Sequence, residues 1–174
     1  MTKIKLTDNL SLSQIIRGFW RLDTWELSTD ELIDNMKSSI DLGVTSFDTA
    51  EIYADTLCES QIGEAFAKDP ALRGKVELIS KTGIYKQEIN GESFGYYNTT
   101  YDRIVRSCKE SLQRLHTGFH SIWFVTSAPS TALFIASNLN GSKFDTPISL
   151  ISPSFFRSSI ALPASHGSKR GSSL

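Results

Sequence analysis

Apolar and polar positions follow two different patterns over the first two thirds of the chain. Short, nearly continuous apolar runs have the length of buried strands and lie within residues 10–22, 44–48 and 76–81. Longer stretches repeat their apolar positions at helical spacing, over about 28–43, 59–68 and 100–115. The order of strand and helix, repeated three times, predicts parallel strands joined by right-handed crossovers.

The boundaries of the expected elements rest on local signals. Ser28 and Glu31 form a capping box, in which the side chain of each accepts the free backbone N–H of the other. Gly43 fits the left-handed residue that ends a helix. The segment between the third strand and the third helix contains Gly91 and Gly95, and we expect it to be a polar, aromatic loop.

Two parallel architectures compete for this pattern. A doubly wound dinucleotide-binding sheet requires a glycine-rich turn directly after its first strand, and the sequence has none there. A (β/α)8 barrel instead carries functional residues at the carboxyl ends of its strands. Asp48 and Lys81 end the second and third strands, and Gly18 and Trp20 lie late in the first. The expected fold class is therefore α/β, a partial (β/α)8 TIM barrel with about the first three to four β/α units.

Composition divides the chain near Gly118. Hydrophobic residues make up 40% of the 174 residues, which is enough for a core. Fourteen basic and 18 acidic residues precede this point, whereas four basic residues and one acidic residue follow it, where serine becomes dense. We therefore expect two units, an N-terminal half-barrel at 1–118 and an atypical serine-rich tail at 119–174.

Charge and hydropathy argue against two classes of partner. The formal net charge is −1, and Lys169-Arg170 is too short a basic cluster to neutralise many phosphates of a nucleic acid. No apolar run approaches the roughly 18–20 residues that span a bilayer, and the first residues lack the apolar stretch of a signal peptide. We therefore expect a cytoplasmic protein that binds neither nucleic acid nor membrane.

The two cysteines give no sign of a cross-link or a metal site. Cys58 and Cys108 lie far apart in the sequence and form no CxxC motif. Each is expected to be a small residue of the core or of a helix.

Three residues near the strand ends form a candidate acid–base site. In a barrel, Asp48 and Tyr53 would share one strand end and its loop, with Lys81 on the adjacent strand. A phenol releases its proton sluggishly at neutral pH, but a nearby ammonium stabilises the phenolate and a carboxylate holds that ammonium in place. Together the three make a general acid for a developing alkoxide. A purely structural ion pair between Asp48 and Lys81 is the alternative.

Four segments resemble, in order and spacing, those of the aldo-keto reductases. They are GFWR at 18–21, GVTSFDTAEIY at 43–53 followed by Glu59 and IGEA at 62–65, SKTG at 80–83, and SLQRL at 111–115. The resemblance covers roughly residues 10–118. It implies a (β/α)8 barrel that reduces aldehydes and ketones to alcohols with NADPH and without a metal.

The resemblance also implies roles for individual residues. Tyr53 would donate the proton, Lys81 would promote its release, and Asp48 would pair with the lysine. Gly18, Trp20 and Asp48 would contact the cofactor, and Trp20 would line the pocket near the nicotinamide. The substrate would be a small-molecule carbonyl compound.

Two departures from the family bear on activity. Ala54 follows the tyrosine where the family usually has glycine, and alanine tolerates a left-handed backbone poorly. The histidine that ends the family's fourth strand falls at Thr126, and a threonine cannot replace an imidazole. His116 and His120 lie too early to take its place and are expected at the surface or at a strand edge.

The coding frame suggests an explanation for this threonine. Shifted by one base, codons for residues 125–131 can encode Leu-His-Arg-Pro, the string typical of the family. The alternative function is therefore a catalytically inactive, truncated or frameshifted fragment that at most binds a partner.

Overall fold

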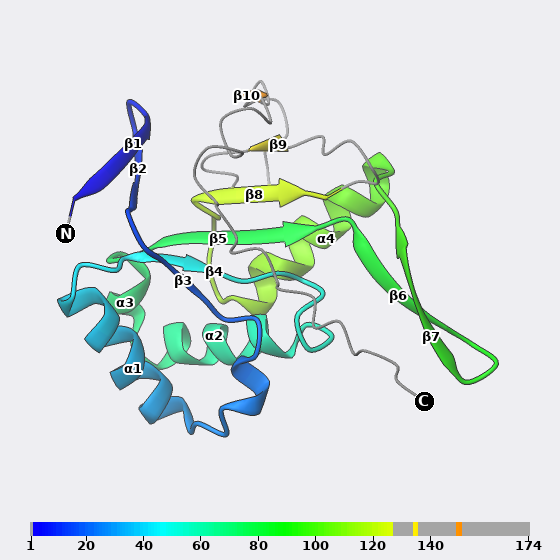
Figure 1. Ribbon diagram of the computed structural model, residues 1–174, viewed down its shortest axis with the longest axis horizontal. Coiled ribbons are helices and arrows are strands. Elements are labelled where there is room, and N and C mark those ends of the chain that lie inside the picture. Colours follow the sequence, from blue (N-terminus) through cyan, green and yellow to red (C-terminus); the bar gives the residue numbers. More distant parts are fainter. Residues whose placement is uncertain (1, 127–133, 136–148, 151–174) are drawn as a thin grey trace, which may run out of the picture.

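The computed structural model describes residues 2–126, 134–135 and 149–150, and its centre is a four-stranded parallel sheet (Figure 1). Its strand order is β3 (Ile16–Gly18), β4 (Ser46–Asp48), β5 (Glu77–Thr82) and β8 (Ile122–Val125). The spatial order follows the chain order, and all three strand pairs are parallel, as the alternating pattern predicts.

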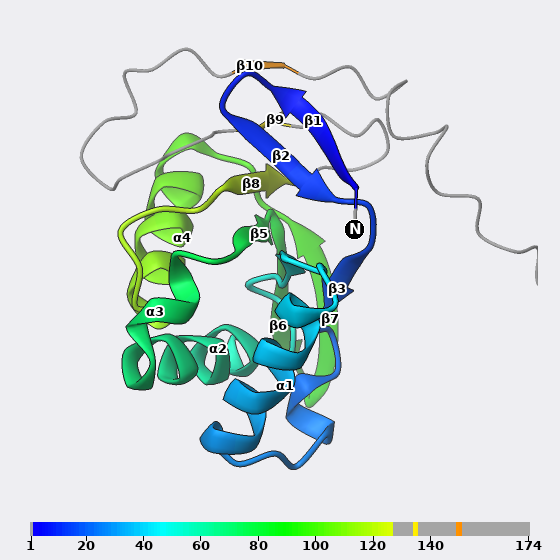
Figure 2. The ribbon, with the colours of Figure 1, turned by 90° about the vertical axis from the view of Figure 1, so that its left-hand side faces the viewer.

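The helices lie along one side of the sheet (Figures 1 and 2). They are the 3-10 turn η1 (Leu22–Thr24) and the helices α1 (Thr29–Asp41), α2 (Leu57–Lys68), α3 (Pro70–Arg73) and α4 (Tyr101–Arg114). The predicted capping box is present at α1, where the Glu31 N–H donates to Ser28 Oγ and the Ser28 N–H donates to Glu31 Oε2 at 2.8 Å. Gly43 has φ 81° after this helix, also as predicted.

Two antiparallel hairpins extend from opposite ends of the sheet (Figure 1). The first pairs β1 (Lys3–Thr7) with β2 (Leu10–Ser13), and the second pairs β6 (Ile84–Ile89) with β7 (Glu92–Tyr97). The expectation of a loop in the second region is wrong. Asn90 and Gly91 have φ values of 54° and 83°, and this pair of left-handed residues matches the twist of a tight hairpin. The short strands β9 (Phe134–Ile135) and β10 (Ser149–Leu150) also pair antiparallel.

The main core fills the space between the helices and the sheet. Phe19 and Phe47 meet edge to face there, with ring centroids 5.4 Å apart. Successive residues of a strand point to opposite faces, so Leu78 joins this core whereas Ile79 packs with Leu12 beneath the first hairpin. The sheet is therefore covered by helices on one face and, near the strand starts, by the β1–β2 hairpin on the other.

A buried carboxylate joins α2 to α4. Glu59 is fully buried and accepts hydrogen bonds from Ser80 Oγ and Ser111 Oγ, both at 2.6 Å, and from Arg114 Nε at 2.8 Å. The two helices approach closely, because a Cβ built on Gly63 would lie 1.8 Å from the Arg114 carbonyl oxygen. A side chain on residue 63 would therefore force the helices apart.

The expectation for His120 is wrong in part. His116 is exposed at the end of α4, as predicted, but His120 is completely buried and its Nε2 lies 3.0 Å from Ser111 Oγ. The pKa of His120 is lowered to about 3, mainly because the ring is buried. The nearby positive charges of Arg73 and Arg114 lower it further. This imidazole is thus a neutral member of the packed interior.

Two further sequence expectations concern cysteines and membrane spans. Cys58 and Cys108 are both buried and free, as predicted. Within the residues that the structure describes, no helix combines the length and the apolar character needed to cross a bilayer.

Candidate active site

The parallel register brings Gly18, Asp48 and Lys81 to one end of the sheet. Gly18 pairs with Asp48 across β3 and β4, and β5 places Lys81 beyond Asp48 on the neighbouring strand. Lys81 Nζ lies 2.5 Å from Asp48 Oδ1 and donates to the Thr49 carbonyl oxygen at 2.8 Å. The two charged side chains are 25% and 28% exposed, so this ion pair is accessible from solvent.

Tyr53 lies on the loop that follows β4 and approaches the same ammonium group. Lys81 Nζ is 5.0 Å from the centroid of the Tyr53 ring. The Trp20 ring lies 6.5 Å from the same tyrosine, centroid to centroid, and Trp20 is 63% exposed. The structure therefore brings Asp48, Tyr53, Lys81 and Trp20 together at the carboxyl ends of the strands.

The backbone after Tyr53 is unusual. Ala54, Asp55 and Thr56 have φ values of 47°, 50° and 77°, so three successive residues with side chains occupy the left-handed region. Ala54 thus adopts the conformation that glycine would adopt more easily. The turn is held by backbone hydrogen bonds from Tyr53 to Ala50 and from Asp55 to Ile52, and by an ion pair at 2.8 Å between Asp55 and Lys86 of β6.

Glu51 is an acidic residue of the same loop for which the sequence patterns predict no role. Glu51 is 6% exposed, and its carboxylate accepts from Thr82 Oγ1 at 2.5 Å and pairs with Arg103 Nη2 at 3.3 Å. Its backbone N–H donates to the Lys81 carbonyl oxygen at 2.9 Å. Glu51 lies within the segment at 43–53, but its partners are distant in sequence and local patterns do not reveal them.

Comparison with known proteins assigns the family. The sequence model described as "Aldo/keto reductase family" matches residues 14–127. The chain belongs to the aldo/keto reductase family.

Curated relatives in this family are oxidoreductases. The chain is 38% identical over 121 residues to the oxidoreductase YcsN of Bacillus subtilis, a match that covers 68% of the chain and 40% of that protein. It is 38% identical over 105 residues to the oxidoreductase YdhF of Escherichia coli, covering 60% of the chain and 35% of that protein. It is 32% identical over 120 residues to a 6-dehydroglucose reductase of Agrobacterium fabrum, covering 67% of the chain and 40% of that protein. The chain thus spans 35–40% of the length of these relatives.

Solved structures of aldo-keto reductases share the fold. One from Pseudomonas aeruginosa is 24% identical, with a TM-score of 0.59 over 72% of this chain and 47% of its own. One from Bacillus halodurans, in its holo form, is 24% identical, with a TM-score of 0.59 over 74% of this chain and 41% of its own. The expected α/β fold, a partial (β/α)8 TIM barrel, is confirmed.

Thr126 lies at the same end of the sheet as the Asp48–Lys81 pair. It follows β8, and its N–H donates to the Thr82 carbonyl oxygen at 2.8 Å. Gly83 faces it with φ 105°, and a Cβ there would lie 2.2 Å from the Thr126 carbonyl oxygen. Where the aldo-keto reductase resemblance places a histidine, this chain therefore brings a threonine close to the strand that carries Lys81. His120 precedes β8 and lies at its other end.

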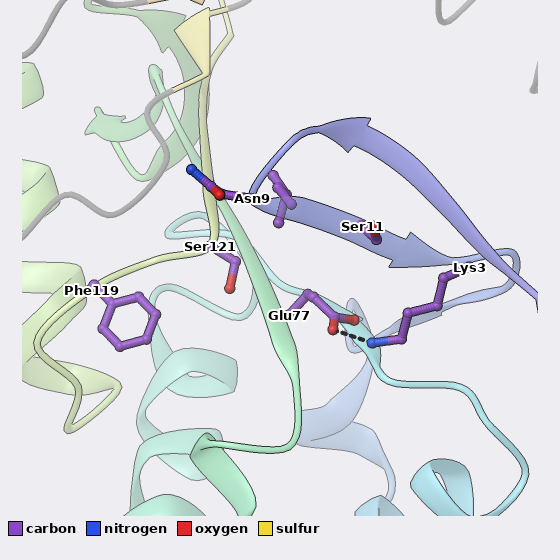
Figure 3. Close-up of a pocket in the computed structure, with 7 residues that line it drawn as sticks. Lys3, Asn9, Ser11, Glu77, Phe119 and Ser121 are labelled. Carbon is purple, nitrogen blue, oxygen red and sulfur yellow. Dashed lines mark hydrogen bonds and ion pairs between the residues drawn. The ribbon is translucent and has the colours of Figure 1, made fainter.

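A pocket of about 430 Å³ lies at the opposite end of the sheet, beside the β1–β2 hairpin (Figure 3). Glu77 lies at the start of β5 and forms an ion pair of 2.6 Å with Lys3 across the pocket. Burial opposes ionisation of Glu77, but hydrogen bonds from Lys3, Thr45 and Ser46 outweigh it and hold its pKa below the ordinary value. In a barrel enzyme the chemistry belongs to the other end of the strands.

Metal-ligating side chains do not gather in the described part of the chain. No group of three or more His, Cys, Asp and Glu residues there has an arrangement that could hold a metal ion.

Proposed function

We propose that this chain carries the proton-transfer part of an NADPH-dependent carbonyl reductase, in which Tyr53 protonates the oxygen of an aldehyde or ketone. The observation that carries this proposal is the position of the Lys81 ammonium, 5.0 Å from the Tyr53 ring centroid and paired with Asp48. We assign the residues of this proton transfer to the N-terminal unit proposed at 1–118.

The ion pair prepares Lys81 for this role. An ammonium has three N–H donors, and Asp48 and the Thr49 carbonyl oxygen accept two of them. The third has no acceptor among the described residues and can donate toward the phenol or the substrate oxygen. As Tyr53 gives up its proton, the ammonium stabilises the phenolate charge, and Asp48 keeps the ammonium in place.

Trp20 and Gly18, at the solvent-exposed side of the site, leave room for a planar ring. Trp20 exposes most of its indole, and no atom of the described residues lies within 4 Å of a Cβ built on Gly18, so this part of the chain leaves the space above the strand end open. We propose that Gly18, Trp20 and Asp48 hold the nicotinamide part of NADPH. When bound, NADPH supplies a hydride to the carbonyl carbon.

NADPH oxidation in the presence of small aldehydes and ketones tests the proposal. We expect the full chain to catalyse it, and Tyr53→Phe to abolish it, because phenylalanine keeps the ring and removes the acidic hydroxyl. Tyr96→Phe is the matched control, since Tyr96 is an exposed tyrosine of β7 and does not belong to the loop that follows β4. A rate that Tyr53→Phe leaves unchanged would overturn the assignment.

A catalytically inactive fragment is the second candidate. Two points favour it: the resemblance to the family places its histidine at Thr126, and among the described strands β3 and β8 each pair with only one neighbour. Such a sheet leaves backbone N–H and C=O groups available to a partner chain. Failure of the purified chain to bind NADPH in a fluorescence titration, with cooperative unfolding intact, would select this function.

A further inference from the structure

A row of buried hydroxyl groups connects helix α4 with the loop that carries Tyr53. Ser107 Oγ lies 2.8 Å from the Tyr85 hydroxyl, which lies 2.8 Å from Thr82 Oγ1, and Thr82 Oγ1 donates to Glu51 Oε2 at 2.5 Å. All four residues are less than a tenth exposed. The reaction proposed above uses none of them.

The carboxylate fixes the direction of every hydrogen in this row. An ionised carboxylate only accepts, so Thr82 gives its single hydrogen to Glu51. The Thr82 oxygen then accepts from Tyr85, whose oxygen accepts from Ser107. All three hydroxyls therefore donate toward Glu51, and bonds aligned in this way strengthen one another in a buried setting.

Arg103 completes the arrangement from α4. Its Nη2 lies 3.3 Å from Glu51 Oε1, the oxygen that Thr82 does not use. Its guanidinium carbon lies 3.9 Å from the centroid of the Tyr85 ring, so the planar group stacks on the same tyrosine that belongs to the row. Both carboxylate oxygens of Glu51 are thus engaged, and the buried charge has a cationic partner.

The contacts of Glu51 also restrict the position of Tyr53. Glu51 precedes Tyr53 by two residues, and its N–H donates to the carbonyl oxygen of Lys81 itself at 2.9 Å. The backbone of Glu51 is therefore fixed to the strand that supplies the ammonium, and its side chain is fixed to Thr82 and α4. The intervening turn brings the Tyr53 ring to within 5.0 Å of Lys81 Nζ.

We propose that the Glu51–Arg103 pair and the hydroxyls of Thr82, Tyr85 and Ser107 hold Tyr53 in place beside Lys81. Glu51 and Arg103 are positioning residues for the proton transfer and make no contact with the reacting atoms. This inference rests on the proposed function in one respect only, namely that Tyr53 is the proton donor. Proton transfer is sensitive to such positioning, since a displacement of about 1 Å can lower a rate by about 100-fold.

Amide hydrogen exchange and kinetics on the full chain test the inference together. The variants are Glu51→Gln and Tyr85→Phe, and the matched control is Tyr96→Phe, because the Tyr96 ring contacts Tyr85 at 5.9 Å but lies outside the row. We expect exchange within residues 49–56 to accelerate by about tenfold or more in both variants, and exchange in α1 to stay unchanged. We expect kcat to fall by about 10- to 100-fold with KM nearly unchanged. Tyr96→Phe should leave both quantities unaltered.

Three outcomes would overturn the positioning role. The first is unchanged exchange at 49–56 in both variants, and the second is faster exchange throughout the chain, α1 included, which would make the row a general stabiliser. The third is a kcat equal to that of the parent. If the parent chain reduces no carbonyl compound, the proposed function fails, and the exchange pattern alone then decides whether the row holds the loop.

Discussion

The Lys81 ammonium lies between an acidic and an aromatic partner that come from the same strand end: Asp48 Oδ1 is 2.5 Å away and the Tyr53 ring centroid is 5.0 Å away. Asp48 ends β4, and Tyr53 follows five residues later on the loop. A single strand-to-loop segment therefore supplies both partners, and the neighbouring strand β5 supplies the charge between them.

Replacement of Lys81 by methionine should lower carbonyl reduction by about 10²- to 10⁴-fold, because the phenolate loses its ammonium partner. Lys68→Met is a suitable control, since Lys68 also forms an ion pair, with Asp30 at 2.7 Å, but does so on the helical side of the molecule. Initial rates of NADPH oxidation measure both variants. Equal rates for Lys81→Met and Lys68→Met would contradict the role given to Lys81.

Substitution of Gly63 by alanine should destabilise the fold by about 1–3 kcal/mol, because the new methyl group would overlap the Arg114 backbone and push α2 away from α4. Gly95→Ala should change the free energy of unfolding by less than about 0.5 kcal/mol, since a Cβ on Gly95 meets no atom within 4 Å. Chemical denaturation measures both. If the two variants unfold alike, the close approach of the helices is not present in solution.

Acid should destabilise the chain through His120. The unfolded chain binds a proton there near the ordinary pKa of 6.5, whereas burial holds the pKa in the folded chain at about 3. The unfolded state therefore binds more protons between these values, so the free energy of unfolding falls as the pH falls from 6.5 toward 3. The slope from this one group is at most about 1.4 kcal/mol per pH unit.

Denaturation at pH 7 and pH 5 checks the contribution of His120. His120→Gln should show a shallower dependence on pH than the parent chain, because glutamine does not titrate. His116→Gln should keep the parent slope, since His116 is exposed. If the free energy of unfolding of His120→Gln depends on pH as steeply as that of the parent chain, other groups cause the acid sensitivity.

Introduction of histidine at Thr126 should raise turnover by about tenfold or more if the remainder of the site is competent, because an imidazole there can donate to the carbonyl oxygen. Gln113→His, on the exposed side of α4, controls for the added imidazole. Steady-state rates with the same aldehyde distinguish the two. No gain from Thr126→His in a chain that binds NADPH would indicate that more than this histidine is missing.

The strand ends and the first helix could be predicted from the sequence because their signals are local. The Ser28–Glu31 box and the left-handed Gly43 depend on residues within a few positions of each other. The proximity of Asp48 and Lys81 also follows from local information, since parallel strands in chain order bring their carboxyl ends together. The roles of Asp48, Tyr53 and Lys81 in catalysis, and of Gly18 and Trp20 in cofactor binding, stay predictions.

Other features of the structure could not be predicted from the sequence, because they depend on contacts between residues far apart in the chain. His120 is buried because elements from distant parts of the chain pack around it, with Arg73 of α3 and Arg114 of α4 close enough to lower its pKa. The partners of Glu51 lie 31 and 52 positions away, so no spacing within the motif reveals them. The β6–β7 hairpin is different, because the signal for its turn, Asn90-Gly91, is local and favours a hairpin over the expected loop.

The strand order β3-β4-β5-β8 has a consequence for synthesis of the protein. Among these four described strands, each one after β3 adds to an edge that the preceding residues have already formed, so its first partner is always encoded before it. A ribosome releases the N-terminal part first, so the sheet can grow one strand at a time as the polypeptide emerges. The direction of translation and the direction of sheet growth are therefore the same.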